Sequence, residues 1–200
     1  MKFYERRFIE AEDISTGPLP AKYLTKTWLA LTLLLALSLF LVSLTTAQIA
    51  LYLLLAPVIA RLIVLDLCYL VLPDIYTLPL IVLGIALTFI PIPSVSLAQS
   101  LLGMLVGGGG ILLLAIVLEK VNKQSNIGGG DIKLIAAAST FIGLESVANF
   151  LWLACAFSFI LYPILRKNRK TISFGPTLAL SFWLLLIHPK IIENALILFI

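Results

Sequence analysis

Long apolar runs, separated by short polar segments, limit the folds open to this chain more than any other feature. The run from Trp28 to Thr45 contains no charged residue and is long enough to cross the hydrocarbon core of a bilayer as a helix. A helix can do so because it pairs its own backbone N–H and C=O groups. Since 61% of the residues are hydrophobic and 12% are charged, most of the chain is expected to lie in a membrane. We predict an all-α fold, a polytopic bundle of membrane helices.

The basic residues favour one number of spans and one orientation. We expect seven spans, near residues 28–45, 49–65, 75–90, 97–118, 132–143, 147–165 and 176–187. With the N-terminus inside, only Lys190 of the 14 Lys and Arg then falls on the outer side. A single crossing by residues 132–165 would instead turn the basic cluster 166–170 outward. Residues 1–27 are then a cytoplasmic arm, and residues 28–200 form the transmembrane domain.

Several functions are disfavoured by the residue types. Cys68 and Cys155 lie far apart in apolar surroundings and lack the CxxC spacing of a zinc site, so we predict no metal. The net charge of +4 comes from basic residues beside the spans, which indicates a lipid bilayer as partner and no nucleic acid. The glycines 107–110 are not followed by the Lys-Ser/Thr of a phosphate loop. We interpret them as a site of close helix packing.

Asp131 follows Gly128, Gly129 and Gly130 and precedes an apolar run. An acid at the start of a membrane helix is either a functional residue or an N-terminal cap, and this segment alone leaves both alternatives open. The glycines carry no side chains, so an extended peptide could approach Asp131 closely.

Asp66 and Asp74 lie in one short segment but differ in their surroundings. Apolar residues flank Asp66 on both sides, where an ionised carboxylate is costly to bury without a partner. Asp74 follows Pro73 at the start of the next span, where we expect it to cap a helix. Of the two, Asp66 is the predicted chemical residue.

The predicted topology brings Asp66 and Asp131 to the same membrane face, each at the cytoplasmic end of a span. Paired carboxylates can hydrolyse an amide: one, ionised, takes a proton from water while the other, protonated, donates to the carbonyl oxygen. Close like charges do not both ionise readily, so the pair would share one proton. The sequence does not assign which Asp is the acid and which is the base.

Three motifs, in order along the chain, resemble the type IV prepilin peptidases, which are membrane aspartyl proteases of the GxGD kind. The motifs are Asp66 with Leu72-Pro73-Asp74 and Thr77-Leu78-Pro79-Leu80, Gly128-Gly129-Gly130-Asp131-Ile132-Lys133-Leu134, and Ser173-Phe174-Gly175-Pro176. The resemblance covers about residues 65–186. It implies that Asp66 and Asp131 are the catalytic pair. The motif or substrate-binding positions that it implies are Gly128, Gly129, Gly130, Lys133, Pro73 and Asp74.

Such enzymes remove the short basic leader from prepilins or pseudopilins at the cytoplasmic side, just before an apolar segment. The resemblance implies an aspartic endopeptidase of the cytoplasmic (inner) membrane that serves a type IV pilus or type II secretion system. Many bacterial members also carry an N-terminal domain with two CxxC pairs that bind zinc, associated with N-methylation. The arm of residues 1–27 contains no cysteine. We therefore expect a short form with no cofactor, neither zinc nor S-adenosylmethionine, and do not expect N-methyltransferase activity.

Three other interpretations fit parts of the sequence. A presenilin-like GxGD protease would carry Tyr before its first aspartate, where this chain has Leu65. An ion- or proton-coupled small transporter using Asp66 and Asp131 would hold them near the membrane midplane rather than at one face. A structural subunit would use its aspartates only as helix caps. Substitution by Asn separates these, because a capping Asp tolerates it and a catalytic Asp does not.

Overall fold

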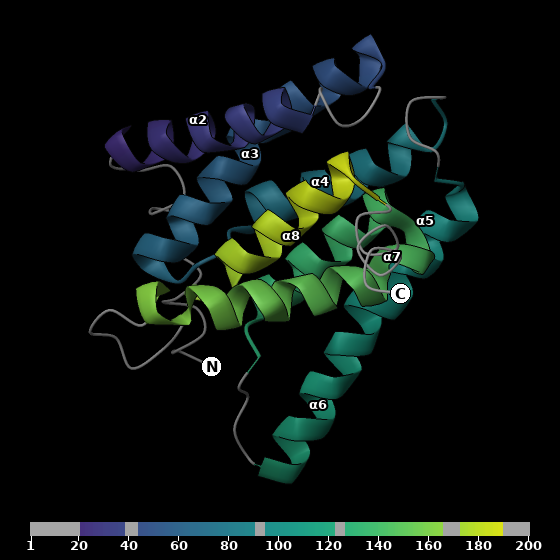
Figure 1. Cartoon of the computed structure of the whole chain (residues 1–200). Helices are drawn as coiled ribbons and strands as arrows, with labels where there is room; N and C mark the ends of the chain where they lie inside the picture. The colour runs from purple at the N-terminus through teal and green to yellow at the C-terminus, as the bar shows by residue number, and fades with distance from the viewer. Residues whose placement is uncertain (1–20, 39–43, 91–94, 123–126, 166–172, 190–200) are drawn as a thin grey trace, which may run out of the picture.

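The fold is a bundle of helices. The structure, a computed structural model, describes residues 21–38, 44–90, 95–122, 127–165 and 173–189. Its helices in chain order are α2 (Ala21–Ser38), α3 (Thr46–Tyr69), α4 (Asp74–Leu87), α5 (Leu97–Met104), the π-helical turn η1 (Leu105–Gly109), α6 (Gly110–Asn122), α7 (Gly129–Leu165) and α8 (Gly175–Ile187) (Figure 1). These described segments contain no strand, so the all-α prediction is confirmed.

Three helical stretches are long and apolar enough to cross a membrane: Thr46–Tyr69, Leu97–Val121 and Gly129–Tyr162. The helices α4 and α8 are apolar but shorter. Large apolar side chains are exposed on the outside of the bundle, among them Leu33, Leu54, Val82, Leu113 and Phe159. Such a surface suits contact with lipid. The helical membrane bundle is confirmed, and the number of seven crossings stays a prediction.

The first described helix starts earlier than the first predicted span. α2 begins at Ala21 rather than at Trp28, so the last part of the segment expected as a polar arm is helical. The rest of that arm, residues 1–20, lies outside the described residues.

The helix α3 has clear signals at both ends. Thr45 and Gln48 form a capping box, in which each side chain accepts a hydrogen bond from the other residue's backbone N–H. Leu70 ends the helix in the left-handed conformation, with φ 57°. Pro73 then serves as the N-cap residue of α4. This short turn keeps the end of α3 and the start of α4 at the same end of the bundle.

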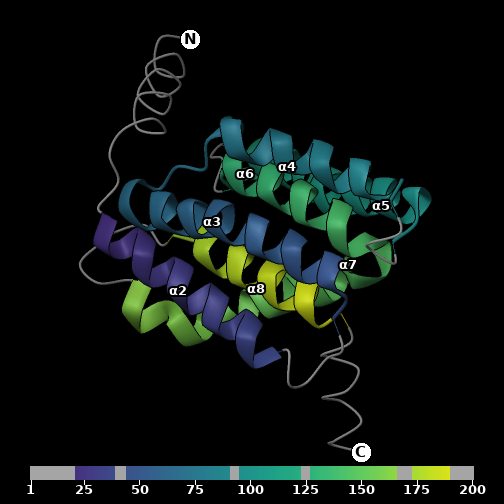
Figure 2. The ribbon, with the colours of Figure 1, turned by 90° about the horizontal axis from the view of Figure 1, so that it is seen from above.

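The helix α7 is two helices joined at Gly143. This glycine has φ 73° and ψ 170°, a conformation that other residues rarely adopt. The chain reverses direction there, so the second half of α7 returns toward the end where the first half began (Figures 1 and 2). The sequence analysis predicted two separate spans here with a break at residues 144–146. In the structure the break is at Gly143, one residue earlier.

Glycines of η1 pack against the first half of α7. A Cβ at Gly108 would lie 2.5 Å from Cβ of Ala136, and one at Gly107 would collide with the hydroxyl of Ser139. The two helical segments therefore approach more closely than side chains would allow. The interpretation as close helix packing is confirmed for Gly107 and Gly108, whereas added Cβ atoms at residues 109 and 110 would meet nothing within 4 Å.

The helix α8 runs through the core, in contact with α2, α3 and α7 (Figure 2). Its Phe182 and Trp183 are at most 1% exposed. Phe182 packs against Phe141 of α7 with ring centroids 5.3 Å apart, and Tyr52 of α3 meets Trp183 edge-on. The Tyr52 hydroxyl also donates a hydrogen bond of 2.9 Å to the Leu186 carbonyl. These contacts fix the position of α8 relative to α3 and α7.

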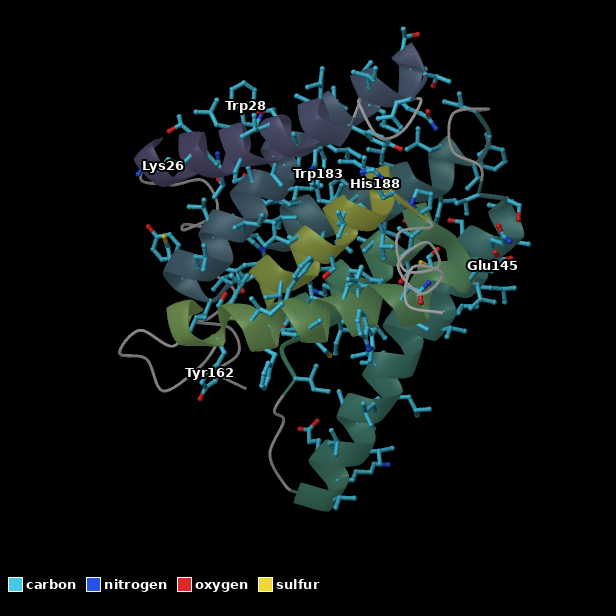
Figure 3. All side chains as sticks on the ribbon, in the orientation of Figure 1. Lys26, Trp28, Glu145, Tyr162, Trp183 and His188 are labelled. Carbon is cyan, nitrogen blue, oxygen red and sulfur yellow. The ribbon has the colours of Figure 1, made fainter. Side chains whose placement is uncertain are left out.

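The bundle has two distinct ends. Figure 3 shows Lys26, near the start of α2, and Tyr162, near the end of α7, toward one end of the molecule. Glu145, just after the turn at Gly143, lies at the opposite end. The C-terminal end of α3 and the start of α8 lie toward the end that carries Lys26 and Tyr162 (Figures 1 and 3).

Candidate active site

One end of the bundle gathers the C-terminal turns of α3 and the first turns of α4, α7 and α8. Three contacts between these segments hold it together: Asp66 with Gly175, Asp74 with Lys133, and Leu72 with Gly130. The partners are far apart in sequence, by 109 residues for Asp66 and Gly175 and by 59 for Asp74 and Lys133. The site is therefore a product of helix packing, not of one loop.

Asp66 is the buried acid of the site, with 5% of its surface exposed. Its Oδ2 accepts a hydrogen bond from the Ser173 hydroxyl and a second one, of 2.9 Å, from the Gly175 backbone N–H. A Cβ at position 175 would lie 2.6 Å from that oxygen. Glycine at the start of α8 is thus what lets the carboxylate reach the backbone amide.

Asp131 lies in the first turn of α7 and is half-buried. The helix begins at Gly129, so Asp131 is inside the helix rather than at the capping position before it. The residue before it, Gly130, packs against Leu72 in the turn that joins α3 to α4. Both acids therefore lie at the same end of the bundle, and their pairing as a catalytic site stays a prediction.

Asp74 and Lys133 form an ion pair. The Lys133 Nζ lies 2.6 Å from both carboxylate oxygens of Asp74, and the two side chains are 38% and 37% exposed. Asp74 is the first residue of α4, whose N-cap is Pro73, and no side chain caps that helix. The expectation that Asp74 caps α4 is therefore wrong: its carboxylate is directed to Lys133, which links α4 to α7.

The three glycines before Asp131 have different surroundings. Gly130 packs on Leu72, since a Cβ there would lie 2.8 Å from Cβ of Leu72. A Cβ at Gly128 would lie 3.0 Å from Oδ2 of Asp131, and one at Gly129 would meet nothing within 4 Å. Gly130 therefore serves the contact between α7 and the turn that joins α3 to α4, and open space lies beside Gly129.

Sequence reasoning found the motif of residues 173–176 but missed what it touches. A contact with an acid could have been inferred from Ser173 and Gly175, because they precede Pro176 at the predicted start of a helix, where hydroxyl and N–H groups are free to donate.

The described residues contain no group of three or more His, Cys, Asp or Glu that could hold a metal ion.

Fold and site together define a class, a helical membrane protein with two acids at one end of its bundle. A model described as the type IV leader peptidase family matches residues 53–164, more than half of the chain. The chain belongs to the type IV leader peptidase family. The matched region contains Asp66 and Asp131, whereas Ser173 and Gly175 lie beyond it. The predicted family is confirmed.

Curated relatives carry matching names. The prepilin leader peptidase/N-methyltransferase of Aeromonas hydrophila is 32% identical over 140 residues, which cover 68% of this chain and 48% of the relative. The protein of the same name from Neisseria gonorrhoeae is 29% identical over 119 residues, 57% of this chain and 40% of the relative. A type 4 prepilin-like proteins leader peptide-processing enzyme of Escherichia coli is 28% identical over 118 residues, 59% of this chain and 44% of the relative.

The chain spans less than half the length of these relatives. No solved structure matches it. The alternative of an ion-coupled transporter finds no support in the comparisons, since the matched family and the relatives above are all named as leader peptidases or leader-processing enzymes.

Proposed function

We propose that this chain is an aspartic endopeptidase that removes the basic leader from a prepilin or pseudopilin at the cytoplasmic face of the inner membrane. The observation that carries the proposal is that Asp66, held against the start of α8, and Asp131, in the first turn of α7, lie at the same end of a membrane bundle. Membership of the leader peptidase family and the names of the relatives support the substrate class.

The chemistry follows from what two neighbouring carboxyl groups can do. The ionised group takes a proton from a water molecule, whose oxygen attacks the carbonyl carbon of the scissile peptide bond. The other group, protonated, donates its proton to the carbonyl oxygen, so a neutral tetrahedral diol forms. Its collapse breaks the C–N bond as a proton passes to the leaving amine, and one proton again remains on the pair.

The surroundings of the pair fit a substrate with a polar leader and an apolar helix. The open space beside Gly129 and the half-buried Asp131 would admit an extended backbone at the end of the bundle. The substrate's apolar segment would remain in the bilayer, alongside the exposed apolar surface of the helices. An amide bond at the boundary between leader and helix would then lie at the level of the two acids.

The test is cleavage of a co-expressed prepilin that carries a basic leader and a Gly before its apolar segment. Wild type, Asp66→Asn and Asp131→Asn are compared at equal membrane expression, with Glu145→Gln as a matched control, because Glu145 is an exposed acid at the opposite end. The readouts are the mobility shift of the prepilin and the mass of the mature N-terminus.

We expect cleavage by wild type and by Glu145→Gln, and none by either Asn variant at positions 66 and 131. The mass of the product also reports whether the new N-terminus is methylated. Wild type that cuts none of several prepilins would overturn the proposed substrate class. Continued cleavage by either Asn variant would contradict the proposed aspartic mechanism.

A further inference from the structure

The two acids of the site differ in their hydrogen-bond donors. Both donors to Asp66, the Ser173 hydroxyl and the Gly175 N–H, converge on Oδ2. Hydrogen bonds donated to a carboxylate favour its ionised form, and the backbone N–H can only donate. Of the residues that the structure describes, none donates a hydrogen bond to the carboxylate of Asp131. Among the described residues, the hydrogen-bond donors to the pair are therefore all on the side of Asp66.

Helix ends and burial do not reverse this difference. Asp66 lies in the last turns of α3, whose negative end disfavours its charge, but its Oδ2 sits at the positive start of α8. Asp131 lies at the positive start of α7, without a hydrogen bond to the amides there. Burial disfavours a charge on either acid. Within the Asp66–Asp131 pair, the two hydrogen bonds from the described residues that favour a negative charge both go to Asp66.

We infer that Ser173 and Gly175 are positioning residues that keep Asp66 ionised as the general base, so that Asp131 holds the shared proton and acts as the general acid. This inference rests on the proposed peptidase function and deepens it. When a substrate binds, Asp66 accepts a proton from water and Asp131 gives its proton to the carbonyl oxygen. Asp131 is also the acid beside the open space at Gly129, where a peptide carbonyl could approach.

The first test is the pH dependence of cleavage by purified enzyme, comparing wild type with Ser173→Ala. Other charged groups near this end are Asp131 itself, the Asp74–Lys133 pair, Lys26 and Arg61, whose guanidinium lies 5.5 Å above the Tyr76 ring. They are unchanged in the variant. Loss of the Ser173 hydroxyl makes Asp66 bind its proton at higher pH. The acidic limb of kcat against pH should then move up by about one unit, and kcat below it should fall about tenfold with KM unchanged.

Two matched variants separate positioning from packing. Ser181→Ala removes another buried serine hydroxyl of α8, one that donates to the Thr177 carbonyl and not to Asp66. Its pH profile should match that of wild type. Ser173→Thr keeps a hydroxyl and should restore the position of the acidic limb. A Ser173→Ala profile that coincides with that of Ser181→Ala, or that moves at its alkaline limb instead, would overturn the inference.

The second test does not depend on cleavage. In an Asp131→Asn background, the infrared carboxyl band of Asp66 is followed against pH, after subtraction of spectra from the Asp66→Asn/Asp131→Asn double variant. Adding Ser173→Ala should raise the pH at which half of that band has developed by about one unit. Adding Ser181→Ala should leave that pH unchanged. An unmoved midpoint refutes the role of Ser173 even if wild type cuts no prepilin. A moved midpoint together with an inactive wild type would refute the peptidase function and leave the hydrogen-bond assignment supported.

Discussion

At the scale of single residues, two glycines matter to the site as much as its acids do, because they leave room for close contacts. Gly175 and Gly130 each occupy a position where a Cβ would strike another segment, Asp66 of α3 in one case and Leu72 of the turn after α3 in the other. Both lie at the first turn of their helices, where backbone N–H groups are free. The acids can thus sit against helix starts without intervening side chains.

Gly175→Ala should lower the cleavage rate about 100-fold while the protein still inserts. The added methyl would need the space of Asp66 Oδ2, 2.6 Å away, so the carboxylate has to move from its donors. A misplacement of a catalytic group by about 1 Å can lower a rate about 100-fold. The measurement is prepilin cleavage at equal expression, with Gly110→Ala as control, because that position is helical and open. Equal rates for the two variants would contradict the close approach of α8 to Asp66.

Asp74→Asn should leave most of the cleavage rate intact. The Asp74–Lys133 pair is more than a third exposed on both sides, so water screens it, and its contribution to the free energy of unfolding is about 0.5 kcal/mol or less. The helices α4 and α7 stay in contact through other residues, including Thr140 against Gly84. Thermal unfolding in detergent and cleavage rates are the measurements. A loss of activity as large as that of Asp66→Asn would give Asp74 a chemical role.

At the scale of helices, two glycine sites give the bundle its shape. Gly143 lets the chain reverse within α7, and without that reversal the second half of α7 would not lead back to Ser173 and the start of α8. Gly107 and Gly108 let η1 lie against the first half of α7, which carries Asp131 at its start. The position of Asp131 therefore depends on contacts well away from the site.

Gly108→Leu should destabilise the bundle, whereas Gly109→Leu should not. Both substitutions improve helix propensity by a similar amount. A side chain at position 108 meets Ala136, however, while one at position 109 has no neighbour within 4 Å. Overpacking of this kind costs about 1–3 kcal/mol. The comparison uses unfolding temperatures of the two variants in the same detergent, and equal temperatures would contradict the close packing of η1 on α7.

At the scale of the whole molecule, the polar groups gather at two opposite ends of an apolar body. Lys26 lies toward one end and Glu145 at the other (Figure 3). The Asp74–Lys133 pair and the two acids belong to the end where α3 finishes and α4, α7 and α8 begin. The exposed surface between the ends is largely apolar. Positive charge near one end is the usual mark of a cytoplasmic face.

Single cysteines should therefore report the two ends from opposite sides of the membrane. In a background where Cys68 and Cys155 are replaced by Ala, Lys26→Cys should react with a membrane-impermeant maleimide only in inside-out vesicles. Glu145→Cys should react only in right-side-out spheroplasts. Both positions are exposed. Labelling of both cysteines from one side would contradict the predicted crossings. Reversed labelling would show that the end with the two acids faces the outside.

The sequence by itself determined the membrane bundle, the approximate spans and the two acids. These features follow from hydropathy and from residues that are costly to bury, which act locally and can be recognised in a short segment. It also indicated a break within α7, since Leu144-Glu145-Ser146 separate two apolar runs, one residue after the observed break at Gly143. It placed the start of the first helix too late, because Lys22 and Lys26 at the beginning of α2 look like part of a polar arm.

Only the tertiary structure decided what surrounds each acid. That Asp66 accepts hydrogen bonds from Ser173 and Gly175, 107 and 109 residues away, depends on how α8 packs between α3 and α7. The partner of Asp74 is likewise Lys133 of another helix, although the sequence favoured a local cap. A capping preference is local and can be read from neighbours, whereas the choice between a cap and a distant partner depends on the distance between helices. That distance is set by side chains and glycines spread over the whole bundle.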